Sequence, residues 1–321
     1  LQLSAQSSNN ASPKHEFRAT WFATVTNIDW PTAPNLTVDQ QKAELRAILD
    51  KLQAGNINAV CLQVRSQGDA LYKSSYEPWA VALTGTRGKD PGYDPLEYAI
   101  QEAHNRGMEL HAWVNPFRMS TTEGGRLTEA QVTDLYNGLS WKWVLTYDNG
   151  TFTGQIIDPG YPDAREYIKN VVMEIVDKYD IDGILMDDYF YPYGGTTDQD
   201  HVSKGLYKPN DVKDINGDGK TDDDWRRSNV DALVKLIYDG LNTGANKKPW
   251  VRFGLAPFGV WTVQPKAAAA YGISLPNGIS GQDCYEQLAC NPIEWIKNGY
   301  IDYVSPQLYW PTATSPNDYR R

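Results

Sequence analysis

Short apolar runs alternate with amphipathic helical segments along most of the chain, and this alternation constrains the fold more than any other feature. Six runs predict strands, and the periodicity between them predicts helices with capping residues such as Thr37 and Asp94. Each run is apolar almost throughout, as parallel strands buried on both faces are. The predicted strands are residues 17–25, 57–65, 108–118, 181–190, 250–259 and 301–310, and the predicted helices are residues 37–56, 94–107, 163–180, 224–242 and 284–299.

The alternation predicts an α/β fold, and the length of 321 residues favours a (β/α)8 TIM barrel over an open sheet. No glycine-rich phosphate loop follows the first strand, which argues against a dinucleotide-binding sheet. Since a closed barrel needs eight strands and six are predicted, we expect the chain to lack the last strands of the barrel. We assign residues 16–321 to this barrel domain and the polar, Ser- and Asn-rich residues 1–15 to a disordered leader.

Charge and hydropathy narrow the range of partners. The net charge of -10 disfavours a nucleic-acid partner, and the sequence has no apolar run long enough to predict a transmembrane segment. The opening LQLSAQ resembles the end of a signal peptide, which predicts an exported protein that is periplasmic, cell-surface or secreted and is associated with the cell envelope. The 11 Trp and 20 Tyr predict either an aromatic core or surfaces on which sugars stack.

The three cysteines do not suggest a disulfide framework. Cys61 falls in an apolar strand, where it is expected to be a small buried hydrophobe. Cys284 and Cys290 are six residues apart on one predicted helix, which directs them to different faces, so a bridge would require that helix to break. The four His residues include no pair at ligand spacing, so no catalytic zinc or iron is predicted.

Polar and aromatic side chains follow nearly every predicted strand, at the end where a barrel carries its active site. Any one of them could be a cap or a loop hydrogen bond, but their convergence predicts a site that binds sugar hydroxyls. The predicted substrate-binding residues are Asn27, Gln63, Arg65, His111, Asn115, Arg118, Tyr189, Tyr191, Gln307, Tyr309 and Trp310.

Two adjacent carboxylates, Asp187 and Asp188, follow the fourth predicted strand and are the candidate catalytic residues. Alternation puts Asp187 on the face of Gly183, and a glycine near a strand start often lines the crowded interior of a barrel. We therefore expect Asp187 at the mouth of the barrel, as a nucleophile or an electrostatic stabiliser. Asp188 should point toward a neighbouring strand or loop, where a salt bridge with Arg65 or Arg252 is the alternative to catalysis.

Several long segments resemble the glycosyl-hydrolase-like 10 family of exported bacterial proteins, among them FRATWFATVTNIDWP, QVRSQGDALYKSSYEPWA, DGILMDDYFYP and YIDYVSPQLYW. The resemblance covers nearly everything after the leader. It implies a (β/α)8 glycoside hydrolase whose barrel continues past residue 310, with Asp187 as a leading catalytic carboxylate. It also implies a bacterial cell-wall or related N-acetylated glycan as substrate, since one branch of the family trims peptide-free strands of peptidoglycan.

Glycoside hydrolysis normally needs a second carboxyl group, and the sequence leaves its identity open. Strand-end twist could bring Asp188 round, and Asp29, Asp69 and Asp158 are expected in rim loops. A residue in a missing strand is a further option, as is the N-acetyl group of the sugar itself. If no second group exists, the competing interpretation is a carbohydrate-binding barrel without hydrolytic activity. The predicted arginines at the rim could pair with the lactyl carboxylate of muramic acid.

The segment DINGDGKTDDDW resembles a calcium-binding loop, with Asp214, Asn216 and Asp218 at its first, third and fifth positions. Trp225 replaces the usual Glu at position twelve, and Asp222, Asp223 or Asp224 could substitute as a ligand, with Asp222 as the candidate carried forward. The alternative is a solvated acidic turn before the next helix. Calcium would be structural here, because the predicted hydrolysis requires no cofactor.

Overall fold

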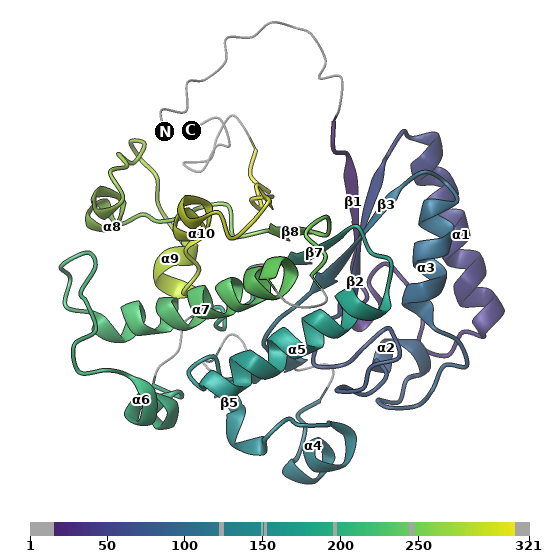
Figure 1. Ribbon diagram of the computed structural model, residues 1–321, viewed down its shortest axis with the longest axis horizontal. Helices are drawn as coiled ribbons and strands as arrows, with labels where there is room; N and C mark the ends of the chain where they lie inside the picture. The colour runs from purple at the N-terminus through teal and green to yellow at the C-terminus, as the bar shows by residue number, and fades with distance from the viewer. Residues whose placement is uncertain are drawn as a thin grey trace, which may run out of the picture.

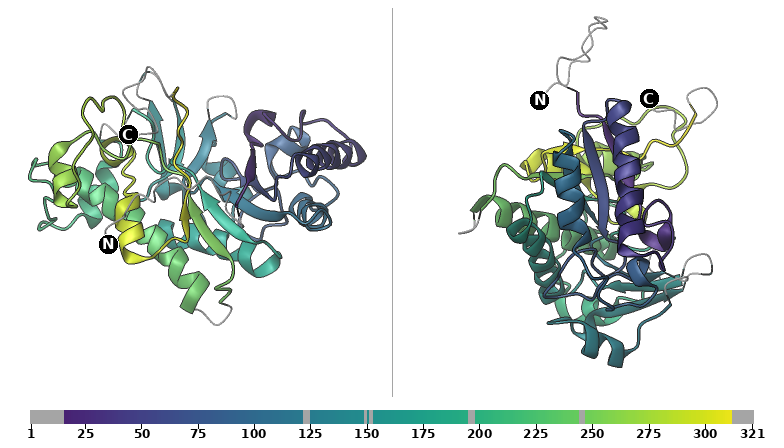
Figure 2. Two further views of the ribbon diagram at one scale, coloured as in Figure 1. Left: turned by 90° about the horizontal axis from the view of Figure 1, so that it is seen from above. Right: turned by 90° about the vertical axis from the view of Figure 1, so that its right-hand side faces the viewer.

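Six parallel strands form the main sheet of the computed structural model, which describes residues 16–121, 125–148, 150, 153–194, 198–243 and 247–311. All six predicted strands are present, and the sheet curls into half of a barrel (Figures 1 and 2). The predicted leader, residues 1–15, lies outside the described residues. The strand order along the sheet is β1 (Ala19–Phe22), β2 (Ala59–Arg65), β3 (Glu109–Val114), β7 (Gly183–Met186), β8 (Arg252–Leu255) and β9 (Tyr303–Val304).

Four long helices cover the outer face of this sheet, α1 beside α3 and α5 beside α7 (Figures 1 and 2). The predicted caps form: Thr37 makes a capping box with Gln40, and Asp94 accepts two backbone N–H groups. No helix in the described ranges combines the length and apolarity needed to cross a bilayer. The helices are α1 (Val38–Ala54), α2 (Val81–Thr84), α3 (Pro95–His104), α4 (Glu129–Leu135), α5 (Pro162–Lys178), α6 (His201–Tyr207), α7 (Thr221–Thr243), α8 (Pro265–Ala270), α9 (Cys284–Gln287) and α10 (Pro292–Asn298), with 3-10 turns η1 (Val25–Asn27) and η2 (Trp141–Trp143).

A second, antiparallel sheet was not expected from the sequence. It contains β4 (Arg118–Thr121), β5 (Val144–Asp148) and β6 (Thr153–Ile157) in the order β4-β6-β5, and it is inserted between β3 and α5. Its strands are four or five residues long and contain polar residues, and so they lack the continuous apolar character that identified the barrel strands.

Strand alternation separates two faces of the main sheet. Ile184 and the other outward residues belong to the large core beneath the helices. The inward residues Cys61, Leu185 and Ala256 form a smaller apolar cluster inside the half barrel. Asp187 follows Leu185 by two residues and so continues the inward face, as predicted.

Replacing Gly183 with Ala is expected to lower the free energy of unfolding by about 1–3 kcal/mol. A Cβ atom at this position would lie 2.6 Å from Cε1 of His111 and 2.9 Å from the carbonyl oxygen of Arg252. Gly205→Ala is the matched control, because nothing lies within 4 Å of a Cβ there, and helix propensity should leave it neutral or up to about 1 kcal/mol more stable. Urea unfolding measures both, and equal stability of wild type and Gly183→Ala would contradict the crowded interior.

Candidate active site

Asp187 lies directly after β7 and is oriented by two donors from the neighbouring strand β3. Its Oδ2 accepts hydrogen bonds from Nε1 of Trp113, at 2.9 Å, and from the side-chain amide of Asn115. The two donors are two residues apart, which puts both on the inward face. Oδ1 of Asp187 has no hydrogen-bond partner among the described residues. The carboxyl group is therefore held in one orientation, with one buried oxygen atom left without a hydrogen-bond partner in the described part of the chain.

A cavity of about 430 Å³ opens beside Asp187 at the carboxyl ends of the strands, a volume usual for small-molecule sites. The predicted residues Tyr189, Gln307 and Tyr309 line it. Trp21 and Trp113 form one wall as an edge-to-face pair with ring centroids 4.8 Å apart. The other lining residues are Ala23, Asp29, Ser305, Pro306 and Leu308. The cavity thus places flat aromatic surfaces around a carboxyl group.

Asp188 is fully buried behind the cavity rather than part of its wall. Its Oδ2 accepts a hydrogen bond from the hydroxyl of Tyr193, and its Oδ1 has no partner among the described residues. The alternative of a salt bridge with Arg65 or Arg252 is wrong, because both arginines pair with glutamates. Asp188 therefore acts on the site mainly through its charge.

The two carboxyl groups perturb each other. Burial, followed by the charge of Asp188, raises the pKa of Asp187 to about 7. Burial also raises the pKa of Asp188. Because two adjacent buried carboxyls cannot both ionise at low cost, the pair retains a proton near neutral pH. A protonated carboxyl in a cavity wall is what general acid catalysis requires.

Three predicted sugar-binding residues instead support Asp187 from behind. Oδ1 of Asn115 accepts hydrogen bonds from Gln63, at 2.5 Å, and from Arg118, at 2.8 Å. Gln63 also accepts two backbone N–H groups of the segment after β1, and Arg118 stacks over the ring of Tyr189 at 4.7 Å. None of the three lines the cavity of Asp187. Their arrangement fixes the direction in which Asn115 donates.

Arg65 does not reach the rim, which corrects its prediction as a substrate-binding residue. Its guanidinium is completely buried in an ion pair with Glu77 at 2.6 Å and donates to the carbonyl oxygen of Pro116 at 3.0 Å. The pairing of β2 with β3 shifts register between Gln63 and Arg65, and such an irregularity changes the direction of the following side chain. Arg65 consequently lies near Tyr167 of α5, on the outer side of the sheet.

Four further predicted binding residues lie outside the cavity of Asp187. The amide of Asn27 donates to two backbone carbonyls and holds its loop. His111 lies deeper on β3 and bonds a tyrosine of β9 at 2.7 Å. Tyr191 is buried against α7, and Trp310 packs on Phe258 with ring centroids 5.4 Å apart. Strand alternation could not predict the side-chain directions of Tyr191 and Trp310, because both residues follow turns.

The structure separates the three loop carboxylates that could complete the site. Asp69 is buried in an ion pair with Arg87 at 3.3 Å. Asp158 lines a different cavity, of about 580 Å³. Asp29 lines the cavity of Asp187, and one of its oxygens accepts the N–H of Ala23 at 2.8 Å. Of these three candidates, Asp29 alone shares the cavity.

The loop that resembles a calcium site is closed by its own hydrogen bonds. Asp214 accepts the N–H groups of Asp218 and Gly219, and Asp218 accepts that of Lys220 at 2.8 Å. No group of three or more His, Cys, Asp or Glu in the described part of the chain is arranged to hold a metal ion. Calcium binding by Asp214, Asn216 and Asp218 stays a prediction.

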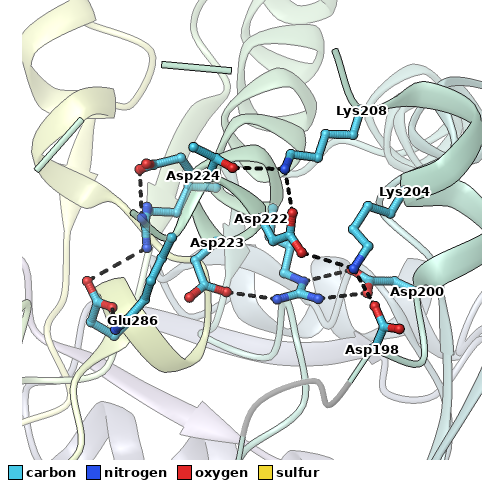
Figure 3. Close-up of polar contacts among 12 residues, drawn as sticks. Asp198, Asp200, Lys204, Lys208, Asp222, Asp223, Asp224 and Glu286 are labelled. Carbon is cyan, nitrogen blue, oxygen red and sulfur yellow. Dashed lines mark hydrogen bonds and ion pairs between the residues drawn. The ribbon is translucent and has the colours of Figure 1, made fainter. Parts of the chain in front are cut away.

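Asp222 is not positioned as the missing calcium ligand. Its carboxylate pairs with Lys204 at 2.9 Å and also with Lys208, so it ties α6 to the start of α7 (Figure 3). The pairing is favourable because acidic groups at a helix N-terminus also interact with the helix dipole. The acidic residues at the start of α7, Asp222, Asp223 and Asp224, are therefore explained by ion pairs.

Sequence reasoning missed two residues that bond the aspartate pair. Trp113 was not predicted to bond a carboxylate, although its position two residues before Asn115 puts its indole N–H on the same face. Tyr193 reaches Asp188 from an irregular segment five residues downstream, and no periodic signal predicts such a return.

A curled sheet of parallel strands, with an oriented carboxyl and aromatic walls at the carboxyl ends, defines a glycoside hydrolase-type α/β barrel protein. Residues 16–321 match the glycosyl hydrolase-like 10 family, and the chain belongs to that family.

Curated relatives and a solved structure agree with this assignment. The chain is 41% identical to glycosyl hydrolase YngK of Bacillus subtilis over 305 residues, which is 94% of this chain and 55% of the relative. It is 33% identical to glycosyl hydrolase DigH of Escherichia coli over 316 residues, 94% of this chain and 67% of the relative. The fold is similar to the PgaB (BpsB) glycoside hydrolase domain of Bordetella bronchiseptica, with a TM-score of 0.54 and 15% identity over 94% of this chain and 77% of that one.

Proposed function

We propose that the chain is a glycoside hydrolase that cleaves an N-acetylated glycan of the bacterial cell wall, with Asp187 as the general acid. One observation supports this most directly: Asp187 lines an aromatic cavity, and its pKa is raised to about 7. A glycosidic oxygen leaves readily only when it is protonated, and a carboxyl with such a pKa carries a proton at neutral pH.

The hydrogen bonds determine which oxygen holds that proton. Oδ2 of Asp187 already accepts two N–H groups, from Trp113 and Asn115. The proton therefore belongs on Oδ1, which has no partner among the described residues. Oδ1 is itself buried, so a sugar bound in the cavity that Asp187 lines would meet it only after the neighbouring side chains shift. The two N–H groups on Oδ2 would stabilise the carboxylate left after proton transfer.

We assign the role of base or nucleophile to Asp29, because it lines the same cavity as Asp187 and is exposed to solvent. The acetamide group of the substrate is the alternative nucleophile, and Asp29→Asn distinguishes the two. A fall in hydrolysis of about 100-fold or more supports Asp29 as base or nucleophile. An unchanged rate assigns that role to the acetamide.

The walls of the cavity suit a pyranose ring. Trp21, Trp113 and Tyr309 offer flat faces with polar edges, which bind the apolar face of a sugar and its hydroxyls together. The proposed substrate is a peptide-free glycan strand of peptidoglycan, and such a substrate implies action outside the cytoplasm in association with the cell envelope. The acidic character of the whole chain disfavours nucleic acid as a partner.

The direct test is the release of reducing ends from peptide-free glycan strands, with chitin oligomers and cellulose as comparison substrates. The proposal expects release from the N-acetylated glycans and none from cellulose. Binding of the glycan strands by calorimetry without release from any substrate would instead support the non-catalytic carbohydrate-binding barrel. If the protein neither binds the glycan strands nor releases reducing ends, both the hydrolase and the carbohydrate-binding barrel are contradicted.

The pH profile should fall on the alkaline side. A general acid works in its protonated form, which is present below its pKa and lost above it, so kcat/KM should decline about tenfold per pH unit above roughly pH 7. Asp188→Asn removes the neighbouring charge that raises the pKa of Asp187, so this decline should begin at a lower pH. Asp177→Asn on the exposed side of α5 is the control and should leave the profile unchanged. If kcat/KM begins to decline at the same pH in Asp188→Asn as in wild type, the proposed effect of the Asp188 charge on the pKa of Asp187 is contradicted.

A further inference from the structure

Cys284 and Cys290 lie next to each other in space, although the sequence put them on different faces of one helix. Helix α9 ends at Gln287, and Ala289 adopts a left-handed conformation with a φ of 52°. The chain therefore turns back, and the N–H of Cys290 donates to the carbonyl oxygen of Cys284 at 2.9 Å. The predicted helix of residues 284–299 is broken into α9 and α10. A disulfide bridge between the two cysteines required such a break.

Both side chains are also fully buried. Burial, followed by the neighbouring Cys284 thiol, raises the pKa of the Cys290 thiol well above its usual range. A backbone hydrogen bond between two residues keeps their Cα atoms within the roughly 4.4–6.8 Å that a disulfide needs. The third cysteine, Cys61, lies elsewhere, in the apolar cluster inside the half barrel.

We propose that Cys284 and Cys290 form a disulfide bond in the oxidised protein. The two S–H bonds break and one S–S bond forms. The two protons and the two electrons pass to an external disulfide, such as oxidised glutathione, whose S–S bond breaks to give two thiols. Because both side chains are completely buried in the folded chain, the exchange takes place during folding, before the core closes over them.

The bond would stabilise the connection between β8 and β9. The N–H groups of Cys284 and Tyr285 donate to the carbonyl oxygens of Val260 and Trp261 at 3.0 and 2.9 Å, so the α9 turn is attached to the segment that follows β8. A non-glycine residue in the left-handed region, Ala289, is strained and persists only where its surroundings hold it. A disulfide across Ala289 would hold the residue in this conformation. The bond would be independent of any hydrolytic activity.

The test is a thiol count on the whole chain. The reduced, unfolded protein is refolded in a mixture of reduced and oxidised glutathione, and free thiols are then blocked with iodoacetamide in the presence of denaturant, which exposes all three cysteines. We expect one blocked thiol, Cys61. Digestion after Lys, Arg and Glu cuts at Glu286, so residues 267–286 and 287–294 should remain joined until reductant is added. Three blocked thiols, a link that includes Cys61, or glutathione adducts on Cys284 or Cys290 would each overturn the proposal.

Variants provide a second measurement that does not depend on refolding. Chain that is exported unfolded and folds in an oxidising compartment should show a melting temperature about 3–6 °C lower after prolonged reduction. Cys61→Ser, the control, should keep both the link and this difference. Cys284→Ser and Cys290→Ser should each abolish the effect of reductant. An equal effect of reductant on all four proteins would contradict the assignment.

Discussion

Asp187→Asn is expected to lower the rate of glycan hydrolysis by about 10²–10⁴-fold, the usual contribution of a general acid. Asparagine has the same shape and keeps an oxygen that can accept the N–H groups of Trp113 and Asn115, so the wall of the cavity should persist. It cannot hold an acidic proton. Affinity for the glycan should therefore stay within about threefold of wild type, because the lost interaction acts in the transition state.

The measurement combines reducing-end release with calorimetric binding of an intact oligosaccharide. Asp163→Asn, an exposed change at the start of α5, is the matched control and should retain full activity. A variant of Asp187 that hydrolyses glycan at the wild-type rate would remove this residue from the mechanism. Loss of both binding and thermal stability would instead indicate that the carboxyl group has a structural role.

Arg65→Met is expected to cost about 3–5 kcal/mol in the free energy of unfolding, because it leaves the carboxylate of Glu77 buried without its partner. Both side chains are completely inaccessible to solvent, and the guanidinium also bonds the backbone at Asn115, at 2.5 Å. The residue that orients Asp187 is thus itself supported by Arg65. Hydrolysis should decrease more than the loss of folded protein alone explains.

Urea unfolding of a double-mutant cycle measures this pair. Arg65→Met combined with Glu77→Leu should destabilise by less than the sum of the single changes, since the unpaired charge is absent. Lys235→Ala, which removes the exposed pair with Asp239, is the control and should change stability by about 0.5 kcal/mol or less. Single variants within about 1 kcal/mol of wild type would contradict a stabilising role for the buried pair.

Sequence periodicity succeeded where a side chain's direction depends on its own strand. Alternation from Gly183 to Asp187 correctly put the carboxyl on the inward face, and Tyr189 follows it into the cavity. The same rule failed at Arg65, where an irregular register between β2 and β3 turned the side chain outward. Such an irregularity arises from the pairing of two strands, and neither strand encodes it alone.

The segments between strands were predicted least well. The antiparallel sheet of β4, β5 and β6 was missed, and the predicted helix of residues 284–299 contains a break at Ala289. The contact of Tyr193 with Asp188 was likewise missed. In each case the conformation depends on contacts between separate segments or across an irregular turn, and the local propensity of a single element carries no information about them.

The order of strands and helices, the parallel sheet and the inward direction of Asp187 were determined by the sequence alone, because they follow from periodicities of two and 3.6 residues within single elements. Tertiary structure decided which groups surround that carboxyl, why it retains a proton, and why two cysteines meet. Burial and hydrogen bonding depend on distances between segments far apart in the chain, and only the folded molecule defines those distances.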